Sequence, residues 1–246
     1  MKNAVVVVAI GLDELLNVTL KSLLHYTNKT NSELVVIGSP KYNITSNFNN
    51  KDTYPIVGEY SYGKFEKNQI YDLFDEYDRI LRLDIDTVIN PDAPNVFDFD
   101  DKYLYAVRED VNDVEVHRQS ELRQIQKDLG RIEGWNTHYC NGGVVLASKQ
   151  HKEVFNIEKI DFDLNLGILK EQNVFNWRVN KLGFEIKNLG PEFNYFTGID
   201  PMGFNVDSIR RKAYIIHHTV QGTQNKLNSM QKDMDFFFGK IKQSKI

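Results

Sequence analysis

Short apolar runs alternate with amphipathic stretches along the first part of the chain. Residues 5–10 form a continuous apolar run, which predicts a central strand buried on both faces. Leucines recur at helical spacing over residues 12–24 and predict a helix that ends between residues 26 and 31. A second apolar strand follows at residues 34–37. A strand, a helix and a strand in this order predict a βαβ unit and hence a parallel sheet.

The remaining pattern extends this α/β arrangement to the end of the chain. The polar, Asn-rich residues 41–52 and the aromatic residues 191–196 are expected to be loops. No repeat and no linker rich in Gly, Pro or Ser interrupts the pattern, so we expect a single domain. Further strands are predicted at residues 56–57, 79–90, 103–107, 144–147, 184–189 and 214–216, and further helices at residues 65–77, 115–129, 171–181 and around residues 234–241.

Composition narrows the class of protein without identifying it. The 246 residues carry a formal net charge of -4, which disfavours a nucleic-acid binder. Cys140 is the only cysteine, which excludes an internal disulfide and a Cys-based zinc site. The apolar N-terminal run is too short for a signal peptide, and no segment approaches the roughly 20 apolar residues of a membrane helix. We therefore expect a cytoplasmic protein without a transmembrane segment.

Two carboxylates mark the end of the apolar strand that begins at Arg79. Asp84 and Asp86 are separated by one residue, so in an extended strand both side chains point to the same face. Carboxylates this close repel each other unless a cation lies between them. Carboxylate oxygens are ligands that suit manganese or magnesium. The sequence therefore predicts a divalent metal site at this strand end.

Later segments place polar groups at predicted strand and helix boundaries. Asn141 and Gly143 belong to a turn with two glycines that leads into a strand, where glycine permits positive φ or a close approach to the backbone. Glu171 and Gln172 open a helix. Glu171 is suited either to the positive end of that helix or to a part in catalysis.

The last predicted strand delivers two adjacent histidines, His217 and His218, which are both candidate metal ligands. Gly222 and Lys226 follow shortly afterwards. Near the middle of the chain, Lys64 or Lys67 can reach a phosphate from the predicted helix at residues 65–77, or can belong to a solvated helix face.

Together these motifs, in this order over residues 4–226, resemble the GT-A fold nucleotide-sugar glycosyltransferases, most closely family 8, the glycogenin and lipopolysaccharide galactosyltransferase group. The resemblance implies a Rossmann-like α/β domain with a mostly parallel, mixed central sheet flanked by helices. It divides the chain into a nucleotide-binding half (residues 1–110), a sugar and acceptor half (residues 111–226) and a C-terminal helix (residues 227–246). It also implies transfer of a hexose from a nucleotide sugar, UDP-linked in the family, with retention of configuration.

The resemblance implies a role for each matching residue. Asp84, Asp86 and His217 match the ligands of a manganese (or magnesium) ion, and His217 matches the family pattern better than His218. Asn141, Gly143 and Gln172 match the sugar pocket, with Glu171 in place of a family aspartate. The other donor-binding positions implied are Ala9, Ile10, Asp84, Gly222 and Lys226, and Lys64 is added as a candidate from the helix pattern and not from the resemblance.

The acceptor is expected to be a glycan, a protein or a lipid-linked molecule, bound by variable segments at residues 111–138 and 193–206. These segments contain Trp135, Phe193, Tyr195 and Phe196, which are suited to sugar stacking or to a hydrophobic core.

Three alternatives to a transferase remain. A phosphohydrolase with an Asp-x-Asp motif needs a threonine where Val88 stands, and a sugar-nucleotide pyrophosphorylase needs a glycine-rich loop after the first strand. A non-catalytic relative that binds nucleotide sugar or carbohydrate would retain the same motifs.

Overall fold

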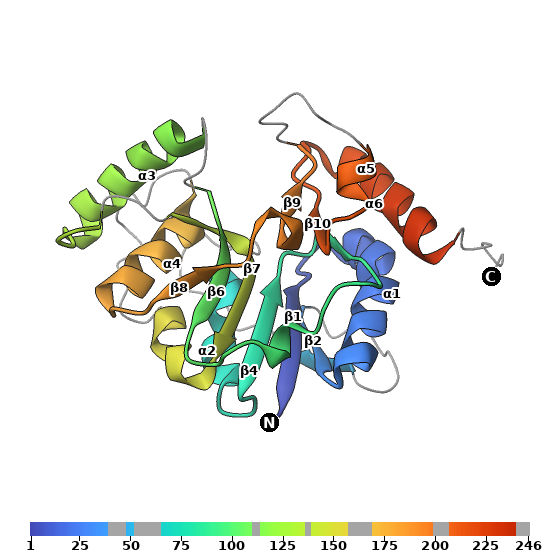
Figure 1. Ribbon diagram of the computed structural model, residues 1–246, viewed down its shortest axis with the longest axis horizontal. Coiled ribbons are helices and arrows are strands. Elements are labelled where there is room, and N and C mark those ends of the chain that lie inside the picture. The colour runs from blue at the N-terminus through green and yellow to red at the C-terminus, as the bar shows by residue number, and fades with distance from the viewer. Residues whose placement is uncertain are drawn as a thin grey trace.

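The structure is a computed structural model that describes residues 1–38, 48–51, 65–109, 114–135, 139–156, 169–198 and 207–239. Within these residues the chain forms two β-sheets surrounded by helices (Figure 1). The strands are β1 (Asn3–Val8), β2 (Glu33–Ile37), β3 (Phe48–Lys51), β4 (Arg79–Leu83), β5 (Thr87–Ile89), β6 (Leu104–Arg108), β7 (Cys140–Ser148), β8 (Ile186–Asn188), β9 (Tyr195–Phe196) and β10 (Ile215–His217). The α-helices are α1 (Asp13–Thr30), α2 (Ile70–Leu73), α3 (Val114–Leu129), α4 (Lys170–Lys181), α5 (Asp207–Arg210) and α6 (Thr223–Phe238), and the 3₁₀ helices are η1 (Phe65–Gln69), η2 (Val96–Asp98), η3 (Lys149–Phe155) and η4 (Pro191–Phe193).

The larger sheet has the strand order β3-β2-β1-β4-β7-β6-β8. β7 runs antiparallel to β4 and β6, and the other neighbouring strands are parallel. The prediction of a mostly parallel, mixed sheet is therefore confirmed. The carboxyl ends of β1, β4 and β6 and the amino end of β7 meet at one edge, so side chains that follow these ends converge there.

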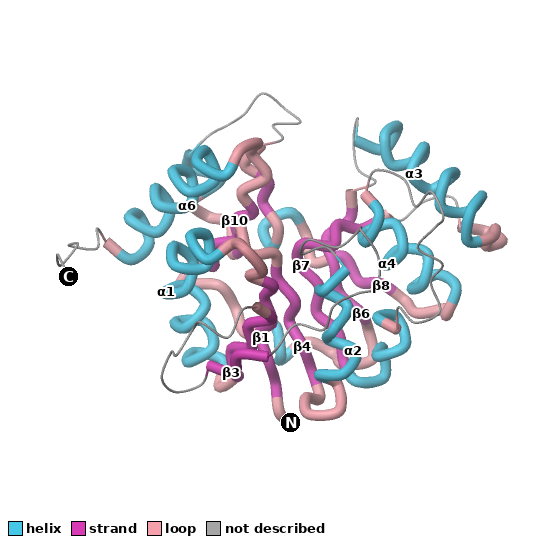
Figure 2. The backbone as a smooth tube through the Cα atoms, turned by 180° about the vertical axis from the view of Figure 1, so that it is seen from behind, coloured by secondary structure: helices cyan, strands magenta, loops and turns pink. Residues whose placement is uncertain are grey.

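Helices cover both faces of the larger sheet (Figures 1 and 2). α1 and α6 pack on one face, whereas α2, η3 and α4 pack on the other. Val5 and Val7 of β1 point into the first core, and Val6 and Val8 point into the second. A strand buried on both faces must be apolar at every position, which explains the unbroken apolar run at the N-terminus.

The segment predicted as one strand over residues 79–90 is two strands in different sheets. β4 ends at Leu83, the chain turns through Asp84 and Asp86, and β5 pairs antiparallel with β10 in the smaller sheet. The Thr87 hydroxyl fixes the turn by donating to the Asp84 carbonyl at 2.7 Å. The aspartates therefore lie in a turn, and the prediction that strand alternation aligns them is wrong.

Two more predictions of local structure are wrong. The loop predicted over residues 41–52 contains β3, an edge strand that pairs in parallel with β2 through main-chain hydrogen bonds, and such pairing tolerates polar side chains. The helix predicted over residues 65–77 is the 3₁₀ helix η1 followed by the short α2. Glu66 and Asn68 are buried in η1 and interrupt the amphipathic pattern. The strand predicted at residues 56–57 lies outside the described residues.

The predicted turn with two glycines is also wrong, since Gly142 and Gly143 lie inside β7. A Cβ at Gly143 would lie 2.5 Å from the Cε1 atom of His217, so the strand needs glycine here for close approach and not for a turn. None of the described helices is long and apolar enough to cross a membrane.

Candidate active site

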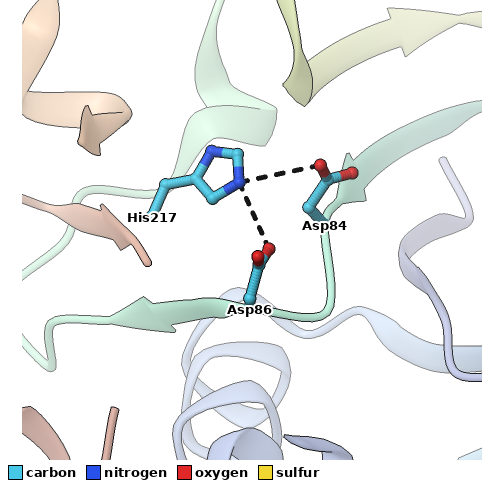
Figure 3. A group of neighbouring side chains, drawn as sticks. All are labelled: Asp84, Asp86 and His217. Carbon is cyan, nitrogen blue, oxygen red and sulfur yellow. Dashed lines mark ion pairs between the residues drawn. The ribbon is translucent and has the colours of Figure 1, made fainter. Parts of the chain in front are cut away.

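The acidic pair lies at the carboxyl edge of the larger sheet, and His217 faces it from β10 (Figure 3). The His217 Nε2 atom is 3.2 Å from Asp86 Oδ1 and 3.7 Å from Asp84 Oδ2. One potential ligand atom from each of these three side chains lies within 4.8 Å of the other two. Ligands on adjacent corners of an octahedron with bonds of ~2.1 Å lie roughly 3 Å apart, so this spacing suits one divalent ion.

Two lysines face the acidic pair from opposite sides. The Lys67 Nζ atom lies 2.5 Å from Asp84 Oδ1, and Lys226 forms an ion pair with Asp86. Burial alone would lower the pKa of Lys67, but the charges of Asp84 and Glu171 raise it, so the ammonium stays charged. Burial opposes ionisation of Asp86, but His217 and Lys226 together lower its pKa, so it stays anionic.

The orientation of His217 is set by asparagine side chains. The Asn194 amide nitrogen donates to Asn141 Oδ1 at 2.8 Å, which turns the Asn194 oxygen toward His217 Nδ1 at 3.0 Å. This network places a proton on Nδ1 and leaves Nε2 facing the two aspartates. Nε2 is therefore placed either to donate a proton to Asp86 or to ligate a cation held by the carboxylates, and the latter arrangement is the usual one for a metal-ligating histidine.

The residues of the predicted sugar pocket form a second network beside the acidic pair. Gln172 Oε1 accepts from the Gly142 main-chain nitrogen at 2.9 Å and from Asn141 Nδ2 at 3.2 Å. The buried Glu109 carboxylate accepts from Asn141 at 2.6 Å and from Gln172 at 3.3 Å, and Arg118 of α3 pairs with it. Glu109 thus anchors both amide side chains.

Glu171 is turned toward the protein interior. Its carboxylate lies 3.0 Å from Arg82 Nη1 and 3.8 Å from Lys67 Nζ. Arg82 is fully buried, and its guanidinium lies over the rings of Phe155 and Phe175. A buried charge requires a partner, so Arg82 and Glu171 hold each other in place. Glu171 lies in the first turn of α4, as expected from the helix dipole.

The two adjacent histidines point in opposite directions. His218 is fully buried, with Nδ1 2.9 Å from Ser229 Oγ and Nε2 3.4 Å from Asp233 of α6. Burial lowers the pKa of His218 to about 3. The geometry therefore brings His217 to the acidic pair and keeps His218 in the core.

A cavity of about 370 Å³ opens beside the acidic pair. It is lined on one side by residues from β1, α1 and the β4–β5 turn, and on the other by the start of α6. Four charged groups of the site line this cavity together with Gly222: Lys67, Asp84, Asp86 and Lys226. A volume of this order suits a small-molecule ligand.

The other predicted site residues are placed as follows. Val8 lines the cavity, whereas Ala9 is buried, Ile10 is half-buried and neither is among the residues that line it. Lys64 lies outside the described residues. Trp135 and Phe193, predicted to stack on a sugar or to belong to a core, are buried in hydrophobic clusters.

The sequence analysis did not assign four residues of the site: Lys67, Arg82, Glu109 and Asn194. Arg82 carried a detectable signal, because a charged residue inside a buried apolar strand needs a partner. Glu109 follows β6, whose carboxyl end reaches the same edge as β4. Lys67 was one of the two lysines considered, and Asn194 belongs to the aromatic segment at residues 191–196.

The fold and the site together define the class of protein. A mostly parallel, mixed sheet between two helical layers is the architecture of the GT-A glycosyltransferases. A sequence profile for glycosyl transferase family 8 matches residues 3–223. The chain therefore belongs to glycosyl transferase family 8, which decides against a phosphohydrolase or a pyrophosphorylase.

Solved structures show the same fold at low sequence identity. The galactosyltransferase LgtC, in complex with donor and acceptor sugar analogs, has a TM-score of 0.58 and 17% identity, covering 94% of this chain and 95% of that chain. A glycosyltransferase involved in glycosylation of the major capsid of PBCV-1 has a TM-score of 0.60 and 11% identity, covering 94% and 100%. GlyE of Streptococcus pneumoniae TIGR4 has a TM-score of 0.57 and 15% identity, covering 100% and 66%. A search of curated protein sequences finds no significant match.

Proposed function

We propose that this chain transfers a hexose from a UDP-linked donor to a glycan, protein or lipid-linked acceptor, with Mn²⁺ or Mg²⁺ bound and with retention of anomeric configuration. The observation that carries this proposal is the group formed by Asp84, Asp86 and His217 beside a cavity, with a lysine on either side.

The side chains available as metal ligands fit the proposed metal ion. Two carboxylates and one neutral imidazole are ligands that manganese and magnesium accept, and the group formed by Asp84, Asp86 and His217 contains no thiolate that would favour zinc. A divalent cation bound there would neutralise charge on the leaving diphosphate. Asn194 keeps Nε2 of His217 directed at this position.

Lys67 and Lys226 are placed to bind the diphosphate oxygens of the donor. Both ammonium groups border the cavity, and each is held by an aspartate that a cation would also engage. When a cation compensates the aspartates, the lysines are free to turn toward phosphate. Their charges then stabilise the negative charge that develops as the bond between sugar and phosphate breaks.

The network around Gln172 is assigned to the transferred sugar. Gln172 is held by Gly142, Asn141 and Glu109, so its side chain has one fixed orientation at the edge of the site. Glu171 is neutralised by Arg82 and Lys67, which makes its carboxylate a poor nucleophile. We assign Glu171 the role of orienting Lys67, and Gln172 the contact with the sugar near its anomeric carbon.

Nucleotide sugars with and without metal provide the test. UDP-glucose, UDP-galactose and GDP-mannose are each added to the protein with and without MnCl₂, and the melting temperature is recorded. Ligand at 100 times its Kd stabilises by about 2.7 kcal/mol. For a domain of this size, that corresponds to a rise of roughly 5–10 °C. We expect this rise for a UDP-sugar only when Mn²⁺ is present, together with release of UDP when an acceptor is supplied.

Asp86→Asn is expected to abolish the metal-dependent rise, because it removes a ligand carboxylate. The matched control is Asp92→Asn, which changes the same chemical group at an exposed position outside the site and leaves the rise intact. A UDP-sugar shift that needs no metal, or that persists in Asp86→Asn, would contradict the metal assignment. Proton NMR of the glycoside product reports its anomeric configuration, and an inverted product would contradict retention.

A further inference from the structure

A second concave site lies along α3, outside the cavity that holds the acidic pair. It is a groove of about 800 Å³ between one flank of α3 and the segment at residues 131–135 that returns from its end. Gln126 joins the two walls, since its amide donates to the Trp135 carbonyl at 3.1 Å and accepts from the Ile132 nitrogen at 3.1 Å. The groove is therefore a built feature and not a gap between independent segments.

The groove is cationic. Arg123, Lys127 and Arg131 line it, and all three side chains are exposed. Within the described part of the chain none of them forms an ion pair or a side-chain hydrogen bond. Three uncompensated positive charges around one concavity, in a protein with a net charge of -4, form a local attraction for anions.

The floor of the groove is apolar. Leu122 and Trp135 line it and are only 4% and 6% exposed, and the Trp135 indole nitrogen is itself shielded from solvent. An apolar aromatic floor beneath a cationic rim suits a saccharide that carries anionic groups, because the sugar faces are apolar and the substituents are charged.

The groove lies next to the proposed sugar pocket through α3 and a shared hydrophobic cluster. α3 carries Arg118, which pairs with Glu109 and thus with Gln172. Arg123 and Lys127 lie roughly 8 Å and 14 Å further along the helix axis and about 140° and 180° around it, so the groove opens on another face of the same helix. Its floor residues Leu122 and Trp135 share a cluster with Tyr139 and with Val174 of α4. Figures 1 and 2 show α3 beside α4, on the side of the sheet away from α6.

We propose that this groove binds the acceptor, and that the acceptor is a glycan bearing anionic substituents, such as carboxylate, sulfate or phosphate groups, some residues away from the sugar that is modified. The position of the sugar that is modified rests on the proposed function, whereas the groove is defined by its own residues. A membrane surface is the less suitable occupant. Membrane-binding faces present protruding apolar side chains, whereas Leu122 and Trp135 are buried at the floor.

The test compares binding of two hexasaccharides to the full chain. A sulfated, heparin-derived hexasaccharide is the anionic probe and maltohexaose is the neutral one, both titrated by isothermal calorimetry at low and moderate salt. We expect the wild type to prefer the anionic probe, and Arg123→Gln/Lys127→Gln/Arg131→Gln to weaken that binding at least tenfold. The matched control, Lys149→Gln/Lys187→Gln/Lys212→Gln, removes the same charge from exposed positions elsewhere and should change the affinity less than twofold.

Two further readouts separate the possible outcomes. Intrinsic fluorescence should change on addition of the anionic probe in the wild type but not in Trp135→Phe. The Mn²⁺-dependent shift with UDP-sugar should be the same in both triple variants, so failure of that shift in the wild type concerns the proposed function and not the groove. Equal affinity for the two hexasaccharides, or an equal loss in both triple variants, would overturn the proposal. Binding to vesicles with a quarter phosphatidylglycerol, lost in the groove variant while no hexasaccharide binds, would assign the groove to a membrane instead.

Discussion

Gly143→Ala tests whether His217 is held in register with the acidic pair by close packing against β7. The added Cβ would lie 2.5 Å from His217 Cε1, 2.8 Å from His217 Nδ1 and 2.8 Å from Asn141 Oδ1. Carbon atoms in ordinary contact are about 3.5–4.0 Å apart, so the ring must move by roughly 1 Å. The strand has little freedom to retreat, because the Gly143 carbonyl accepts from the Asp84 nitrogen at 2.8 Å.

The expected result is a loss of metal affinity in a protein that still folds. Displacing a group that orients a metal ligand costs about 10–100-fold in affinity, or about 1.4–2.8 kcal/mol. Overpacking of this kind lowers the free energy of unfolding by about 1–3 kcal/mol. Mn²⁺ binding in the presence of UDP is measured by calorimetry, and thermal melts establish that the variant unfolds cooperatively.

Gly142→Ala is the matched control for this variant. Its Cβ would meet Arg82 Nη2 at 3.2 Å and Glu171 Oε2 at 3.5 Å, which are the ends of side chains and lie on the other side of β7 from His217. Its Mn²⁺ affinity should stay close to that of the wild type. If Gly143→Ala folds and binds Mn²⁺ as tightly as the wild type, the contact with β7 does not set the position of His217, and the reasoning that close packing holds this ligand is refuted.

Two further predictions concern a polar network and a buried histidine. Glu109→Gln replaces an acceptor oxygen with an amide that cannot accept from all three of its donors, so Gln172 loses its fixed orientation. We expect kcat to fall about 10–100-fold with little change in the donor KM, while the exposed Glu133→Gln has no effect; a change confined to KM would argue against a positioning role. His151 accepts from the Ser148 nitrogen at 3.0 Å, and burial lowers its pKa in the folded protein. At a pH between this lowered pKa and the unfolded pKa of about 6.5, only the unfolded chain binds a proton at His151. Its contribution to stability is therefore complete above pH 6.5 and is lost as the pH falls, so acid melts should show a drop in melting temperature that His151→Gln reduces and the exposed His25→Gln does not.

The sequence pattern predicted the sheet better than it predicted the turns at its edge. The apolar run of β1 and the helical spacing of α1 predicted a parallel sheet because burial on both faces leaves a clear periodicity. β3 was not predicted because an edge strand stabilised through its main chain needs no apolar side chains. The turn at Asp84 was not predicted because the apolar residues continue from β4 into β5 although the two strands belong to different sheets.

Some residues of the site could be recognised from the sequence, and others only from the structure. Asp84 and Asp86 were detectable because two nearby carboxylates have an electrostatic cost that is visible in the sequence. Glu109 and Asn194 act through hydrogen bonds to side chains far along the chain, and such pairs become visible only when the sheet order is known. The contact of Lys67 with Asp84 likewise requires the winding of η1, which the sequence pattern did not predict.

The smaller sheet accounts for how residues so distant in sequence keep a fixed spacing. β5 follows the Asp84–Asp86 turn directly, and it pairs with β10 so that Thr87 lies opposite His217. The next residue, His218, donates its main-chain nitrogen to the Asp86 carbonyl at 2.8 Å, and its buried ring is held against α6. The distance from His217 to the acidic pair is therefore set by main-chain pairing and by a core histidine, not by the long side chains around the site. The two adjacent histidines thus have different positions: His217 faces the site, and His218 joins the same strand to the Asp86 carbonyl and to α6.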